Sequence, residues 1–202
     1  MPRILPLLVL IGLTAPAFAA GALDGWNAYK FGMSPDAARA VPGQVFGPYN
    51  PKNLWNENKG AMAAKKESVL YGQGWTLNLF FDSNAKLNGI GLENERKASR
   101  EDCEKNFLSV LSALEKTQGG LAPVNPERKR LDSDTPPTSL EWRVAGASRY
   151  QLAVVSFADE YAYAWKARKT DKGNYVELAG TWAAAPDSKS APCVVSINYS
   201  GK

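Results

Sequence analysis

The chain lacks the side chain on which most common hydrolases depend, because none of its 202 residues is histidine. Ser-His-Asp and Cys-His catalysis both need an imidazole base, and ordinary zinc sites draw on histidine and cysteine. We therefore expect no metal and no cofactor. The chemistry left open is that of carboxylates or of a Ser-Lys pair.

Two short motifs could supply such chemistry. Ser83-Asn84-Ala85-Lys86 has the S-x-x-K spacing of acylating enzymes in which a neutral lysine activates serine. These residues fall in an expected hairpin turn instead of a helix, and no Lys-Thr-Gly strand follows. Asp159 and Glu160 could form an acid–base pair, but adjacent residues of a strand point to opposite faces. The sequence therefore predicts no enzyme, with a carboxylate-based glycan hydrolase as the alternative.

Cys103 and Cys193 are the only cysteines. Since the chain is expected to reach an oxidising compartment, we expect these two to form a disulfide. Two buried free thiols are the alternative.

A stretch without hydrophobic period, residues 42–63, combines three aromatic side chains with several asparagines and is expected to be a long loop. Phe46, Tyr49 and Trp55 could contact sugar rings or a protein surface, since aromatic rings give contact area and amides give direction. Long loops of this kind are often functional. The alternative is that the rings fold back over a sheet.

A second aromatic set lies on an expected strand, where Tyr161, Tyr163 and Trp165 share one face and alanines occupy the other. If the alanine face is the covered one, these rings form an exposed binding platform. The alternative is that the aromatic stripe belongs to the core.

The elements that must position these residues follow from hydrophobic period and turn signals. A short helix is expected after Ser34 and Pro35, and a long one over 100–118, with Ser99 as its cap. Strands are expected at 67–71, 75–81, 86–93, 139–145, 149–157, 160–169, 174–182 and 193–199. This order predicts an α+β fold with one short and one long helix on antiparallel sheet. A tandem helix–three-strand repeat is one form that it could take.

Residues 1–19 have the pattern of an export signal, with Arg3, a short apolar run and Ala17-Phe18-Ala19 as the cleavage site. The run is too short to span a membrane, and no cysteine follows it, so we expect neither a membrane span nor a lipid anchor. The mature chain is expected to be periplasmic or secreted and to form one domain over 20–202. Lobes at 20–98 and 99–202 are an alternative division.

The net charge of +4 is small, and the basic residues are scattered among acidic ones. Nucleic-acid binding requires clustered positive charge, so we expect no nucleic-acid partner.

The segment Phe31-Gly32-Met33-Ser34-Pro35-Asp36-Ala37-Ala38 resembles a phrase of bacterial envelope proteins in which Gly-Met-Ser/Thr opens a short helix on a three-stranded antiparallel sheet. The outer-membrane assembly lipoprotein BamE and the β-lactamase-inhibitor-like proteins have this unit. The resemblance implies a small exported domain that binds other macromolecules without catalysis. It favours a binding or inhibitory module for an envelope protein or a glycan. A carrier of a small apolar ligand is a further alternative, and the oligomeric state stays open.

Overall fold

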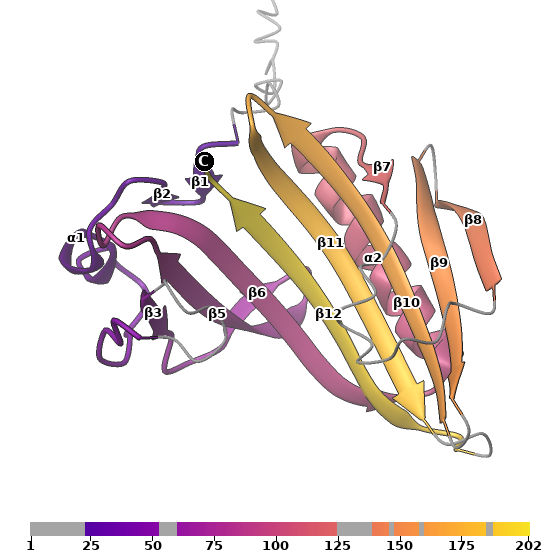
Figure 1. Cartoon of the computed structure of the whole chain (residues 1–202). Helices are drawn as coiled ribbons and strands as arrows, with labels where there is room; N and C mark the ends of the chain where they lie inside the picture. The colour runs from indigo at the N-terminus through magenta and orange to yellow at the C-terminus, as the bar shows by residue number, and fades with distance from the viewer. Residues whose placement is uncertain (1–22, 53–59, 125–138, 146–147, 158–159, 185–187) are drawn as a thin grey trace, which may run out of the picture.

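A computed structural model describes residues 23–52, 60–124, 139–145, 148–157, 160–184 and 188–202; for residues 139–162 it describes the course of the strands. The expected export signal lies outside the described residues. The fold is α+β, as expected from the sequence, with one long helix on one face of a large antiparallel sheet (Figure 1). In the described ranges, no helix is both long and apolar enough to cross a membrane.

The main path of the sheet has the strand order β3-β5-β6-β12-β11-β10-β9-β8. Outside this path, β4 pairs with β5 and β7 with β10, while β1 and β2 form a separate small sheet. The strands are β1 (Gly25–Trp26), β2 (Tyr29–Lys30), β3 (Gly60–Ala63), β4 (Ser68–Leu70), β5 (Gln73–Phe81), β6 (Leu87–Ala98), β7 (Ala122–Pro123), β8 (Ser139–Ala145), β9 (Ser148–Phe157), β10 (Glu160–Asp171), β11 (Asn174–Ala184) and β12 (Ala191–Ser200).

The centre of the sheet joins the two parts of the chain that the sequence separates as lobes. Strand β6 pairs with β12 along its length, from Gly89 opposite Ser200 to Ala98 opposite Ala191. Residues before and after the long helix therefore share one sheet.

Both helices begin where the sequence predicts them. Helix α1 (Pro35–Arg39) is capped by Ser34, whose hydroxyl accepts a hydrogen bond from the Ala37 amide. Helix α2 (Arg100–Gln118) is capped by Ser99 and buries one stripe of its surface against the sheet. The buried residues of this stripe are Cys103, Asn106, Phe107, Val110, Leu111 and Leu114.

The disulfide between Cys103 and Cys193 is present, as predicted, with the two Cα atoms 5.6 Å apart. It ties the first turn of α2 to β12. In the chain-entropy description, closing a loop over 90 positions removes about 4–5 kcal/mol of unfolded-state entropy. The bridge therefore fixes where α2 begins on the sheet.

A chain of amides connects α2 to the sheet beside its apolar stripe. The Gln73 Nε2 donates to the Asn106 Oδ1 at 2.7 Å, and the Asn106 Nδ2 donates to the Asn94 Oδ1 at 3.2 Å. The Asn94 Nδ2 then donates to the Gly74 carbonyl at 2.8 Å. These bonds offset the cost of burying Asn106.

Near the C-terminal end of α2, the carboxylate of Glu115 is partly removed from solvent. The Glu115 side chain accepts a hydrogen bond from the Leu121 backbone, but its Oε1 is buried and has no partner among the described residues. Desolvation raises the pKa of the Glu115 carboxyl above its ordinary value. The helix itself ends at Gly119, which has a positive φ of 81° and donates to the Glu115 carbonyl.

Within 42–63, the described residues 42–52 and 60–63 do not form the long unpaired loop that the sequence predicts. Strand β3 occupies its last four residues and pairs with the edge of β5. The segment 45–50 then runs along the other side of β3, where the Gly47 amide donates to the Ala63 carbonyl and Asn50 pairs with Ala61. The missed strand has no alternation of polar and apolar side chains, so its pairing depends on the edge that β5 offers.

Candidate functional site

Two of the three aromatic residues of the 42–63 segment can be placed, and both pack inward. Phe46 is 5% exposed and meets the Tyr29 ring edge-on, with centroids 5.8 Å apart. Tyr49 is half-buried, meets the Phe81 ring at 5.5 Å and lies against Gly60. Because the segment pairs with β3, Phe46 belongs to the core and cannot contact a partner. Trp55 lies outside the described residues.

Tyr163 and Trp165, the two described side chains of the aromatic stripe of β10, lie on the side of the sheet that α2 covers. Trp165 is 1% exposed, and its ring lies 6.3 Å from the Phe107 ring of the helix. Tyr163 is half-buried between Trp182 at 5.8 Å and the Arg100 guanidinium, whose Cζ lies 5.1 Å from the ring centroid. Trp165 is therefore a core residue and no part of an exposed platform, and the Tyr161 side chain lies outside the described part of the chain.

Of the residues with catalytic spacing, the structure describes the side chains of Ser83 to Lys86, and these form a turn. Ser83 to Lys86 lie in the turn between β5 and β6, where the Asp82 Oδ1 accepts hydrogen bonds from the amides of Asn84 and Lys86. Glu160 begins β10, and Asp159 lies outside the described residues. In the portion of the chain that the structure describes, no three metal-ligating His, Cys, Asp or Glu side chains form a group.

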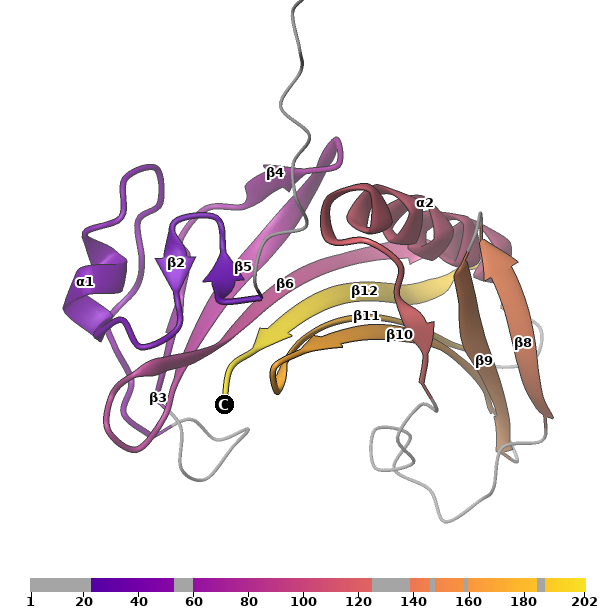
Figure 2. The same cartoon turned by 90° about the horizontal axis from the view of Figure 1, so that it is seen from above.

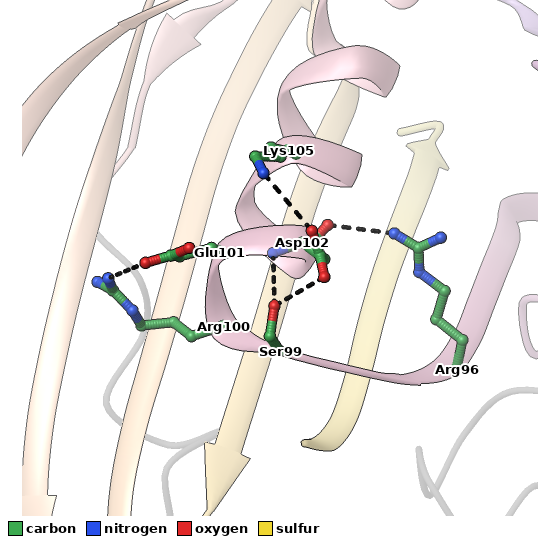
Figure 3. A network of polar contacts seen from close by, with 6 residues as sticks. All are labelled: Arg96, Ser99, Arg100, Glu101, Asp102 and Lys105. Carbon is green, nitrogen blue, oxygen red and sulfur yellow. Dashed lines mark hydrogen bonds and ion pairs between the residues drawn. The ribbon is translucent and has the colours of Figure 1, made fainter. Parts of the chain in front are cut away.

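A polar network surrounds the first turn of α2 (Figure 3). The Asp102 amide donates to the Ser99 hydroxyl at 3.1 Å, and that hydroxyl donates to the Asp102 Oδ2 at 2.8 Å. The Arg96 guanidinium reaches the Asp102 carbonyl, and the Lys105 Nζ lies 3.6 Å from the Asp102 Oδ1. The hydrogen bond from Ser99 holds the pKa of the Asp102 carboxyl below its ordinary value. These contacts are those of a helix cap, and they account for the network without a ligand.

The opposite face of the sheet carries a row of residues from five strands, four of them with polar side chains, which the sequence does not predict. Figures 1 and 2 show α2 on one face of the strands β6, β12, β11 and β10, and the sheet bends away from the helix. Alternate residues of each strand point to the other face, which we call the helix-free face. Since the strands are in register, five of them contribute to one row: Asn78, Gly91, Asn198, Glu177 and Arg168.

At the β5 end of the helix-free face, the Phe80 ring packs against Gly89 and Gly91 of the neighbouring strand. A Cβ at Gly89 would lie 3.2 Å from the Phe80 Cβ, and a Cβ at Gly91 would lie 3.2 Å from the Phe80 Cε2. The ring of Phe80 therefore lies across the backbone of β6, and the side chain stays half-buried. An alanine at either glycine would have to displace the Phe80 side chain by a few tenths of an ångström.

Two amide side chains flank this ring. Asn78 lies on β5 and Asn198 on β12, with β6 between them, so the two side chains are about 10 Å apart. Both are half-buried. The Asn198 Nδ2 donates to the Ser196 hydroxyl at 3.3 Å, and its Oδ1 would lie 3.5 Å from a Cβ at Gly91.

The β10 end of the helix-free face holds a buried ionic cluster. The Glu177 Oε1 lies 3.1 Å from the Lys166 Nζ, and both side chains are 7% exposed. The Glu177 Oε2 accepts hydrogen bonds from the Nε and Nη2 of Arg168, whose Cζ lies 4.5 Å from the Tyr175 ring centroid. Both oxygens of Glu177 are thus bound by cations. This leaves no free carboxylate oxygen there for proton transfer, and it holds Arg168 and Tyr175 in place.

Comparison with protein-family models, with curated proteins and with solved structures found no match to this chain. The resemblance of residues 31–38 to envelope proteins therefore stays a prediction.

Sequence reasoning misses the helix-free face because its row is made from strands that are far apart along the chain. The one signal in the sequence is the alternation of polar and apolar residues in β5 and β12. Such alternation indicates that one side of a strand faces solvent, but it does not show which strands are neighbours in the sheet.

Proposed function

We propose that this chain is an exported, non-enzymatic binding protein that holds a saccharide chain against the helix-free face of its sheet. The observation that carries the proposal is the half-buried Phe80 ring, fixed across Gly89 and Gly91 and flanked by Asn78 and Asn198. Export to the periplasm or secretion is inferred from residues 1–19.

The chemistry of the helix-free face suits a sugar better than a protein surface. A sugar ring offers C–H groups to an aromatic face and hydroxyls to amides and hydroxyl side chains, and each type of partner is present here. Protein interfaces instead centre on buried apolar and aromatic anchors. The exposed large apolar side chains of the described residues are Val45 (61%), which lies outside the strands, and Val69 (83%), which lies on the three-residue strand β4 at the margin of the sheet.

Binding without catalysis is inferred from the row of Asn78, Gly91, Asn198, Glu177 and Arg168, whose one carboxylate is held in the ionic cluster. A glycan hydrolase needs two carboxyl groups that face each other across the bond, one of which gives a proton. The buried carboxylate of the face, Glu177, has both oxygens bound by Lys166 and Arg168. A rigid Arg168 beside Tyr175 can instead donate to saccharide oxygens at the end of the row.

The proposal is tested by isothermal titration calorimetry of the purified chain with soluble oligosaccharides of cellulose, chitin, xylan and peptidoglycan. We expect at least one of them to bind, and Phe80→Leu to weaken that binding about three- to tenfold, the value of an aromatic contact beyond its buried area. Leucine keeps the glycines covered, so this variant should fold. Val45→Ala, which removes an exposed side chain from outside the strands, is the matched control and should bind as the parent does.

Two results would overturn the proposal. One is that no oligosaccharide of the panel binds to the folded chain. The other is that Phe80→Leu binds as tightly as the parent, which would move the contact away from this face.

A further inference from the structure

At the β8 end of the main sheet, the last strand of the path pairs with one neighbour, β9. Strand β8 (Ser139–Ala145) is the last strand of the main path and pairs with β9 from Ser139 opposite Val154 to Ala145 opposite Ser148. Among the described residues, no strand pairs with its outer edge. An edge of seven residues presents a row of backbone donors and acceptors that another strand can use.

The sequence of this edge strand has a symmetry of charge. It reads Ser-Leu-Glu-Trp-Arg-Val-Ala, so Glu141 and Arg143 stand on either side of the central Trp142. If two copies of β8 pair antiparallel about position 142, position 141 of each copy stands opposite position 143 of the other. Each dimer then contains two opposite-charge pairs, which stabilise neighbouring strands.

Two other ways of pairing two copies put like charges together. Parallel pairing in register places Glu141 opposite Glu141, and an antiparallel shift of two residues places either Glu141 or Arg143 opposite itself. Like charges directly opposite are destabilising. Among these three arrangements, the charge pattern favours the antiparallel pairing about position 142, which forms two opposite-charge pairs.

We propose that β8 is the interface of a two-fold symmetric homodimer in which the two main sheets continue across paired β8 strands. The occupant of the edge is a second copy of this chain, because the strand is complementary to itself. Such an interface is isologous, so each copy contributes the same residues. The helix-free faces of both copies then lie on the same side of the joined sheet. This inference is independent of saccharide binding.

The proposal is tested by sedimentation equilibrium of the whole mature chain, with Glu141→Arg, Arg143→Glu and the double variant. We expect the parent and the double variant, which restores opposite charges, to dimerise alike. Each single variant places two like-charge pairs in the interface and should weaken dimerisation by roughly tenfold or more. An equimolar mixture of the two single variants should form a heterodimer, since the two arginines at positions 141 and 143 of one chain then face the two glutamates at these positions of the other.

Recovery in the mixture also shows that the single variants are folded. A parent chain that stays monomeric at every concentration would overturn the proposal, as would single variants that dimerise like the parent. A parent that stays monomeric but binds a foreign strand at β8 would also overturn it. The titrations with oligosaccharides give a separate readout, and the single variants should leave it unchanged.

Discussion

Replacing Gly180 by alanine should destabilise the protein by overfilling the contact between α2 and the sheet. A Cβ at this position would lie 3.0 Å from the Phe107 Cδ2 and 3.2 Å from the Trp165 Cε3, whereas carbon atoms in contact are normally about 3.5–4.0 Å apart. Phe107 is fully buried, and Trp165 is 1% exposed. Neither ring can turn outward, so the added methyl group must displace α2 or distort β11.

The expected loss follows from two opposing effects. Overfilling a packed core costs about 1–3 kcal/mol. Replacing glycine stabilises by about 0.4–1 kcal/mol through the unfolded chain. We expect a net decrease of about 1–2 kcal/mol in the free energy of unfolding, measured by equilibrium urea denaturation with the disulfide intact.

A matched control is Gly47→Ala, because a Cβ there would lie 3.7 Å from the Ala63 carbonyl, an ordinary contact. That variant should be as stable as the parent or slightly more stable. Combining Gly180→Ala with Phe107→Leu should cost less than the sum of the two changes, since the residues are in contact. A Gly180→Ala protein that equals the parent in stability would refute the close packing of α2 on β11.

Four further changes test other parts of the fold. Glu177→Gln should lower the free energy of unfolding by about 3–5 kcal/mol, because it leaves the buried Lys166 and the partly buried Arg168 without their carboxylate. Asp36→Ala, in an exposed pair, should change it by no more than about 1 kcal/mol in the same urea titration. Cys103→Ser with Cys193→Ser should cost up to about 4–5 kcal/mol relative to the oxidised parent, and a reduced parent that matches the oxidised one would contradict this. For Glu115 the folded pKa is raised, so stability should fall as the pH rises from the ordinary glutamate pKa through the folded value. Glu115→Gln should remove that fall in urea midpoints, and an unchanged pH profile would contradict the assignment.

The local parts of the fold can be predicted from the sequence because their signals are local. Helix α2 is predicted from Ser99 and a one-sided apolar stripe, and its observed bounds are Arg100–Gln118. The turn at Gly72 and the alternation in β5 likewise predict the hairpin of β4 and β5. In each case the capping residue, the turn residue and the hydrophobic period agree.

The parts that depend on long-range pairing cannot be predicted in the same way. Strand β3 has weak strand character, and the pairing of 45–50 with its edge decides that Phe46 is buried. The orientation of β10 is also nonlocal, because both of its faces contain apolar residues and only the docking of α2 decides which one is covered. The helix-free face escapes prediction for the same reason.

The most direct test of the central claim is a titration of the ¹⁵N-labelled chain with the oligosaccharide that binds best, followed by NMR of the side-chain amides. We expect the side-chain signals of Asn78 and Asn198 and the backbone amide of Gly91 to shift together with one dissociation constant. Signals from the α2 side, such as the buried side-chain amide of Asn106, should stay in place. Saturable binding that leaves the Asn78 and Asn198 signals unmoved would contradict a saccharide site on the helix-free face.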